Sequence, residues 1–338
     1  MQQTSGDTPE AAAVAGVQAA GAGESRGGSR AGRVAWLLAR LGITGGAFAY
    51  LLSQVEFGQL SAAFGRVPAR AVLVSLSLYV AAVWLGAYRW RILFASCGAS
   101  RVPGYLQLLR LTFIGLFYNT YLPGAVGGDL VRGVATGGYF DEGGSTSALA
   151  VSFLDRVLGF AGLLVMAALA FSLHPVHGVE GLLPWAGAGL LAVSSVVLVL
   201  TTGRHLGRFL PSALARIADR LPQVQSVLGI VVVLCIALFG HAMYIAIGHV
   251  LVLAVSPGVG LADSAVIIPG TVVASAFPLT VAGAGPTEAA FVALYGLVGV
   301  ARPDALAASL LILLCRLLVA GSGGVVSVFE GRAAQTED

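Results

Sequence analysis

The sequence is poor in charge and contains no lysine. Only 10% of its 338 residues are charged, and all 19 basic side chains are arginines. A soluble domain carries about 25% charged residues, whereas 57% of these residues are hydrophobic and the mean hydropathy is +0.89. These values exclude a water-soluble globular fold and predict an integral membrane protein. The formal net charge of +3 is too small, and the arginines too dispersed, for a nucleic-acid surface.

Motifs that mark enzymes and metal sites are also missing. Cys97, Cys235 and Cys315 are far apart in or beside apolar runs, which predicts buried packing rather than disulfides or a CxxC metal site. His241 and His249 share one apolar run, where satisfied core histidines are commoner than metal ligands. Walker, GxSxG and His-x4-Asp motifs are absent, and the longest polar segment is the N-terminal tail. We therefore expect no enzyme activity, no cofactor and no metal.

Six apolar stretches reach the roughly 20 residues that a helix needs to cross the hydrocarbon core of a membrane. They cover residues 34–54, 71–95, 147–173, 182–202, 225–254 and 305–328. Residues 1–33, rich in Ala, Gly and Ser, predict a disordered cytoplasmic tail. The membrane domain is expected over residues 34–330, followed by a short C-terminal tail over 331–338.

Two further apolar regions, residues 105–126 and 264–300, are interrupted by proline and glycine. Arginine clusters at residues 26–33, 89–110 and 204–220 mark the cytoplasmic side and place the N-terminus there. Three full crossings between the second and third clusters would end on the wrong side of the membrane. One segment must therefore enter and return, and we predict that both interrupted regions are re-entrant hairpins of broken helices.

This arrangement divides the membrane domain into two similar halves of opposite orientation, residues 34–173 and 182–328. Each half consists of two spans, a re-entrant hairpin and a further span. Asp129 follows the first break and Arg156 follows it 27 residues later, while Glu288 and Arg316 repeat the pattern at 28 residues. The sequence thus predicts an all-α membrane fold with about six full spans, two hairpins and an inverted repeat, an architecture found in transporters.

Ionisable side chains within the spans are the candidate substrate-binding residues, because burying a charge in a membrane costs about 2.5–3.5 kcal/mol. The candidates, with one amide beside the first break, are Asn119, Asp129, Arg132, Asp155, Arg156, Glu288 and Arg316. We expect the acids to orient the arginines, and the arginines to bind an anionic headgroup bidentately. The alternative is that the charges neutralise one another and lock the two halves together, and both can hold.

Prolines and glycines at the two breaks form a second candidate group. They are Pro123, Gly124, Gly127, Gly128, Pro278, Gly283 and Gly285. Such residues permit a turn and leave backbone N–H groups bare for an anion. The alternative role is close helix packing, as small residues provide throughout membrane bundles.

Local spacing gives further expectations about these side chains. Asp129 and Arg132 pair on one face if the chain is helical there. Asp155 and Arg156 point about 100° apart around a helix and need different partners. Asn119 is expected to cap a freed backbone group. Arg89, with Arg91 at the end of its span, is expected to reach lipid phosphates at the membrane surface.

The run from Asn119 to Arg132, N-x-x-L-P-G-x-x-G-G-D-x-x-R, resembles the lysylphosphatidylglycerol synthase transmembrane-region family. The Ser152–Arg156 segment and the Pro278–Glu288 segment support the resemblance, which extends over residues 34–330. It implies a membrane domain that moves a phospholipid between leaflets, whereas a separate soluble domain performs aminoacyl transfer in that family. This sequence shows no such domain before Asp338.

We therefore expect a flippase-like transporter of an anionic or aminoacylated phospholipid, or of another lipid-linked substrate, in a bacterial-type cell (inner) membrane. Two alternatives stay open. One is a transporter of a small solute coupled to protonation of Asp129 or Glu288. The other is a non-transporting membrane partner of a separately encoded lipid- or glycan-modifying enzyme. Membrane phospholipids are the expected partners, and homo-oligomerisation stays open.

Overall fold

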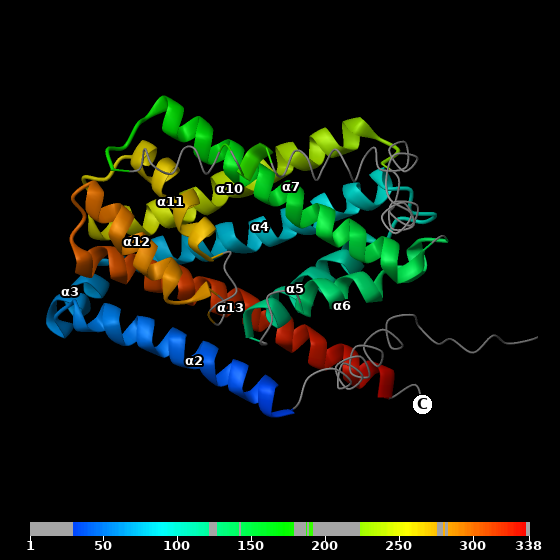
Figure 1. Ribbon diagram of the computed structural model, residues 1–338, viewed down its shortest axis with the longest axis horizontal. Coiled ribbons are helices and arrows are strands. Elements are labelled where there is room, and N and C mark those ends of the chain that lie inside the picture. The colour runs from blue at the N-terminus through cyan, green and yellow to red at the C-terminus, as the bar shows by residue number, and fades with distance from the viewer. Residues whose placement is uncertain are drawn as a thin grey trace, which may run out of the picture.

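The computed structural model describes residues 30–121, 127–141, 143–178, 187, 189–191, 224–275, 280 and 283–335. Within these ranges the chain is helical and has no strand, which confirms the predicted all-α fold (Figure 1). The helices are α2 (Arg30–Ser53), α3 (Phe57–Arg66), α4 (Ala69–Ser96), α5 (Tyr105–Tyr121), α6 (Gly127–Ala135), the 3-10 helix η2 (Gly137–Tyr139), α7 (Gly144–Leu173), α10 (Val227–Val255), α11 (Leu261–Ser275), α12 (Pro286–Leu297) and α13 (Arg302–Gln335).

Four described helices are long and apolar enough to cross a membrane: α4, α7, α10 and the Arg302–Val328 part of α13. The 28 residues of α4 extend about 42 Å at 1.5 Å per residue, more than the roughly 30 Å hydrocarbon core. These helices match four of the six expected spans. The first expected span corresponds to α2, whose apolar part is the shorter segment Leu41–Ser53. The expected span 182–202 lies outside the described residues except for 187 and 189–191.

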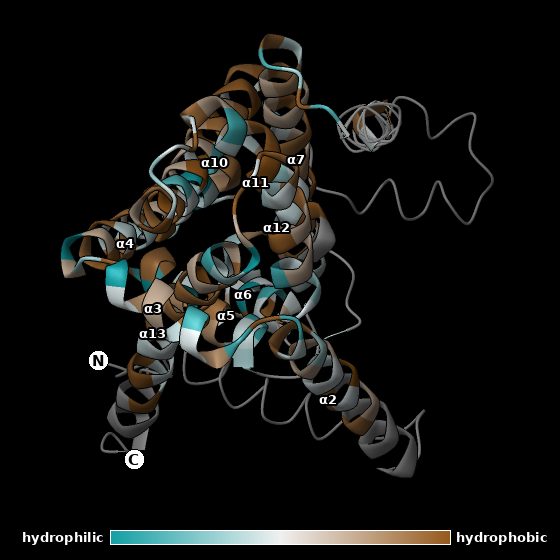
Figure 2. Ribbon diagram, turned by 90° about the vertical axis from the view of Figure 1, so that its left-hand side faces the viewer, coloured by the Kyte–Doolittle hydropathy of each residue, from teal (hydrophilic) through white to brown (hydrophobic). Residues whose placement is uncertain are grey.

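Large apolar side chains are exposed on the outside of these helices, and hydrophobic residues colour most of their ribbons (Figure 2). Leu73 on α4 is 62% exposed, Phe239 on α10 61% and Leu318 on α13 54%. Such exposure would be a liability in water but suits contact with lipid tails. With the long apolar helices, it identifies a multi-pass membrane protein.

Both interrupted regions form pairs of short helices, α5 with α6 and α11 with α12. In the second pair, Gly285 has φ +99° and Pro286 is the first residue of α12. Glycine adopts this left-handed conformation without strain, and proline fits the first helical turn because its missing N–H would be unpaired there. The two pairs lie at opposite ends of the molecule (Figure 1).

The helix pairings repeat when the two halves are exchanged. α4 packs along α10; the contact of α5 with α13 corresponds to that of α11 with α7, and the contact of α4 with α13 to that of α10 with α7. An internal repeat would give this pattern.

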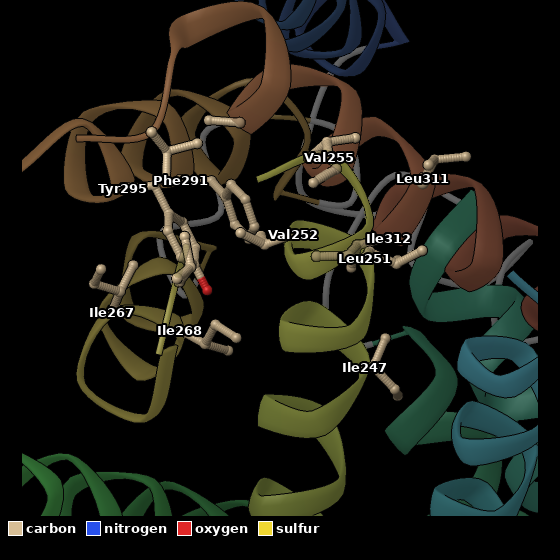
Figure 3. Packing of buried hydrophobic residues seen from close by; sticks show 14 of the residues in the cluster. Ile247, Leu251, Val252, Val255, Ile267, Ile268, Phe291, Tyr295, Leu311 and Ile312 are labelled. Atoms are coloured by element: carbon tan, nitrogen blue, oxygen red, sulfur yellow. The ribbon is translucent and has the colours of Figure 1, made fainter. Parts of the chain in front are cut away.

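Each half also has its own apolar core. In one, Phe291 and Tyr295 of α12 pack with Ile268 of α11 and Leu251 of α10 (Figure 3). The other core lies mainly between α4, α5 and α7.

Candidate functional site

A bidentate ion pair joins α4 to α7 in the first half of the molecule. Arg89 donates from Nε to Asp155 Oδ1 at 2.9 Å and from Nη2 to Asp155 Oδ2 at 3.0 Å. The side chains are only 19% and 9% exposed. The expectation that Arg89 reaches the membrane surface was therefore wrong, because the guanidinium turns inward to a buried carboxylate.

A second ion pair joins α6 to α7. Arg156 donates from Nε to a carboxylate oxygen of Asp129, the acid in the first turn of α6. Asp155 and Arg156 thus have different partners, as their angular separation on a helix requires. Asp129 and Arg156 are the acid and the arginine whose spacing recurs in Glu288 and Arg316, although that spacing predicts only a repeat and not an ion pair.

Arg132 lies between these two pairs and forms a longer ion pair with each carboxylate, including the predicted one with Asp129. Its Nη1 is 3.7 Å from Asp129 Oδ1 and its Nη2 is 3.9 Å from Asp155 Oδ2, both beyond hydrogen-bonding distance. The guanidinium carbon sits 4.0 Å from the centroid of the Trp90 ring, a cation–π contact. The buried Nε of Arg132 has no hydrogen-bond partner in the described part of the chain.

Packing determines the glycine positions at the first break. Asn119 Oδ1 accepts a hydrogen bond from the Gly128 N–H at 2.9 Å, so Asn119 acts as the expected cap. A Cβ on Gly128 would lie 2.0 Å from the Gly115 carbonyl oxygen, because α5 and α6 touch here, whereas a Cβ on Gly127 would meet nothing within 4 Å. The Gly128 N–H is therefore not bare for an anion. Pro123 and Gly124 lie outside the described residues.

The second break is arranged differently. Glu288 is 2% exposed and its Oε2 accepts a 2.5 Å hydrogen bond from the Gly285 N–H, at the start of its own helix. The acid therefore caps α12 and forms no ion pair with Arg316 in the described part of the chain, although both residues line one small cavity. Gly283 and Gly285 both have positive φ, which explains their identity as glycines. Pro278 lies outside the described residues.

Arg316 has neither an ion pair nor a hydrogen bond within the described part of the chain, and its Nε is buried. It lies near the middle of the long apolar helix α13. An arginine does not deprotonate in proteins, so its charge persists in the membrane.

The charged residues of both halves line connected cavities. A cavity of about 700 Å³ is lined by Asp129, Arg132, Asp155 and Arg156, and a neighbouring one of about 380 Å³ by Arg316 with Tyr79 and Tyr244. Five residues line both cavities: Val83, Arg89, Leu116, His241 and Val272. Glu288 lines a third, small cavity that shares Tyr244, Thr287 and Arg316 with the second.

Sequence reasoning missed four lining residues: Tyr79, Arg89, Tyr244 and His241. The position of Arg89 inside a long apolar run was a usable signal, but the aromatic residues carry none that separates them from core residues. His241 bonds the Gly159 carbonyl at 2.8 Å and His249 the Ser264 hydroxyl at 3.0 Å. The described residues contain no group of three metal-ligating side chains.

Two of the three cysteines are packed as expected. Cys97 and Cys315 are buried, whereas Cys235 is exposed on α10, so the expectation for Cys235 was wrong. Burial raises the pKa of the Cys97 thiol to about 12.

Comparison with known proteins agrees with this architecture. A UPF0104 membrane protein of Pyrococcus horikoshii is 26% identical over 136 residues, which are 40% of this chain and 38% of that protein. The chain therefore matches less than half of that relative's length. The model of the family described as Lysylphosphatidylglycerol synthase TM region matches residues 37–323. This match covers most of the chain and the whole of the described site, and the protein belongs to that family.

Proposed function

We propose that this protein moves a phospholipid between the two leaflets of a bacterial-type inner membrane, with its N-terminus in the cytoplasm. The proposal makes it a transporter rather than an enzyme, with membrane phospholipids as its partners. Asn119, Asp129, Arg132, Asp155, Arg156, Glu288 and Arg316 are proposed to act in substrate binding, directly or by orienting one another.

The connected cavities carry the proposal. They place charged side chains from both halves inside a bundle whose outer surface is apolar. A headgroup crossing the membrane needs polar partners along its path, because desolvating a charge in hydrocarbon costs many kcal/mol. Its acyl tails can stay in the lipid that surrounds the helices.

The helix arrangement also suits alternating access. α4 packs against α10, and the contact of α5 with α13 in one half corresponds to the contact of α11 with α7 in the other. Two halves related in this way can adopt two equivalent arrangements, each of which opens the cavities at a different end of the molecule. Only a few kcal/mol need separate such states. The end of α13 and the Arg101-bearing loop between α4 and α5 lie toward the same end of the molecule (Figure 1), and a cytoplasmic position for that end follows the arginine bias.

Lipid movement in proteoliposomes tests this function. Tail-labelled anionic and zwitterionic phospholipids are incorporated in both leaflets, and an impermeant reductant bleaches the outer label. Wild type is compared with Arg156→Ala and Glu288→Gln, with folding checked for each. Arg302→Gln is the matched control, because Arg302 is exposed and contacts only Gln54 among the described side chains.

With wild type and with Arg302→Gln, we expect the reductant to bleach clearly more than half of the label, because lipid from the inner leaflet reaches the outer one. With Arg156→Ala and Glu288→Gln, we expect bleaching to stop near half of the label. Folded wild-type protein that moves no lipid would overturn the proposed function in favour of a solute transporter or a non-transporting partner. Equal movement by all four proteins would show that the cavity charges are structural.

A further inference from the structure

The charges that line the three cavities do not balance. Among the described residues, four arginines face three carboxylates, which leaves one positive charge uncompensated. The segments at the two breaks, residues 122–126 and 276–282, contain no charged residue in the sequence. The described lining of the cavities therefore carries a net charge of one positive unit when Glu288 is ionised.

Each carboxylate is already engaged by the protein itself. Asp155 accepts two hydrogen bonds from Arg89, and Asp129 is paired with Arg156. Glu288 accepts the Gly285 N–H. An ammonium group entering the cavities would find no uncommitted carboxylate among the described lining residues and would face their excess of positive charge.

Hydrogen-bond donors, in contrast, are uncommitted on Arg132 in the larger cavity and on a group of three residues in the smaller one. Arg316, Tyr79 and Tyr244 line the 380 Å³ cavity, and none of them forms a hydrogen bond within the described part of the chain. The three groups are close enough to interact electrostatically. A planar guanidinium with hydroxyl donors beside it matches the two non-bridging oxygens of a phosphodiester.

We propose that the substrate is a phospholipid whose headgroup carries the phosphodiester as its only charge, and that Arg316, Tyr79 and Tyr244 bind this phosphate. The inference rests on the proposed function and narrows it. One negative charge neutralises the cavity, whereas a zwitterionic headgroup leaves its excess charge and an aminoacylated, cationic headgroup increases it. Arg89, which borders this cavity and the larger one, is the next cation on the path.

Binding measured separately from transport tests the inference. Purified protein is equilibrated in mixed micelles with phosphatidylglycerol, phosphatidylethanolamine and lysyl-phosphatidylglycerol of identical acyl chains, and native mass spectrometry counts each bound lipid. The proteins are wild type, Arg316→Gln, Tyr244→Phe and the control Arg302→Gln. A parallel arm adds inorganic phosphate, the soluble source of the same chemistry.

We expect wild type and Arg302→Gln to bind phosphatidylglycerol about tenfold more than either amine-bearing lipid, the value of one charge-assisted contact. Arg316→Gln should lose this preference and Tyr244→Phe should weaken it. Inorganic phosphate at the same concentration as the lipid should not displace bound phosphatidylglycerol from the protein.

Equal binding of the three lipids, or preference for the lysyl lipid, would overturn the inference even if all three are transported. A preference for phosphatidylglycerol that survives in Arg316→Gln would overturn the assignment of the binding site to Arg316. Displacement of the lipid by inorganic phosphate would show that the site binds free phosphate rather than a lipid phosphodiester. Selective binding by a protein that transports no lipid would support the phosphate site and refute the proposed function.

Discussion

The arginines of the cavities differ in how the protein holds them. Arg89 is fixed by two hydrogen bonds to Asp155, whereas Arg316 has no ion pair in the described part of the chain. Removing one partner of a buried ion pair leaves an uncompensated charge and costs about 3–5 kcal/mol. Removing an unpaired cation carries no such penalty, so the two kinds of arginine have opposite effects on stability.

Asp155→Asn should therefore destabilise the protein. We expect a loss of about 3 kcal/mol, at the low end for buried pairs because Arg89 is partly exposed and Arg132 is also near. Thermal unfolding in detergent measures it. Asp304→Asn is the control: Asp304 pairs with the half-exposed Arg66, a surface contact worth about 0–1 kcal/mol. Equal losses for the two variants would contradict a structural role for the Arg89–Asp155 pair.

Arg316→Gln should leave the unfolding temperature unchanged or raise it. The substitution removes a charge whose burial in a membrane costs about 2.5–3.5 kcal/mol and breaks no ion pair among the described residues. The same unfolding measurement applies. A large drop in stability would mean that Arg316 holds the fold together, and its assignment to substrate binding would fail.

The Cys97 thiol should resist alkylation. Its pKa of about 12, raised by burial, keeps it almost fully protonated at pH 8, and the thiolate is the reactive form. A maleimide at pH 8 should spare Cys97 until the protein is denatured, and Cys235 is followed separately because its exposed thiol lies on the membrane-spanning helix α10 and faces lipid rather than water. Peptide mass spectrometry distinguishes the two sites, and rapid labelling of Cys97 in folded protein would contradict its packing.

The sequence predicted those contacts that follow from helical periodicity. The i,i+3 spacing indicated Asp129 with Arg132, whose Oδ1 and Nη1 atoms lie 3.7 Å apart, and adjacency separated the partners of Asp155 and Arg156. It did not predict the partner of Arg89, because α4 and α7 are brought together by the fold. Nor did it predict that Glu288 caps its own helix, since an acid three residues after a glycine can turn back or reach across.

Among the helices, the two short pairs carry Asn119, Asp129, Arg132 and Glu288. α5 and α6 approach closely only because Gly115 and Gly128 lack side chains, and the space at Gly115 admits the Arg132 side chain. Glycines at the first break therefore position a charged group through packing.

Gly128→Ala should destabilise the α5–α6 pair. Its Cβ would lie 2.0 Å from a backbone oxygen that cannot rotate away, so we expect a loss of about 1–3 kcal/mol or more. Gly127→Ala is matched in chemistry and meets nothing within 4 Å, so its stability should change by less than about 0.5 kcal/mol. Thermal unfolding of both variants is the measurement, and equal stability would show that the helices do not touch as described.

Helix breaks were predictable because proline and glycine interrupt long apolar runs, and the breaks fall where the sequence indicated. The positions of the helix ends were not predictable from hydropathy. α2 begins at Arg30 and α13 continues to Gln335, so helices cross both hydropathy boundaries, and α3 was not anticipated. Hydropathy detects what is apolar, whereas a helix continues through polar residues as long as its backbone hydrogen bonds are favourable.

Across the molecule, the ion pairs of the first half line the larger cavity, and Arg316 with Tyr79 and Tyr244 lines the smaller cavity beside it. One apolar core stabilises each half, and the cavities extend between residues of the two halves. This separation lets the ion pairs of the first half fix the helices while Arg316 of the second half stays available for an anion. The sequence repeats the spacing of an acid and an arginine in both halves, but only the first half joins them in an ion pair among the described residues.

The rate of phosphatidylglycerol movement across proteoliposome membranes, compared between wild type and Arg316→Gln at equal amounts of folded protein, tests this arrangement most directly. We expect wild type to move the lipid well above the rate of protein-free vesicles, and Arg316→Gln to fall to that background while its unfolding temperature is maintained. Movement at the wild-type rate by Arg316→Gln would contradict the central role of the unpaired arginine.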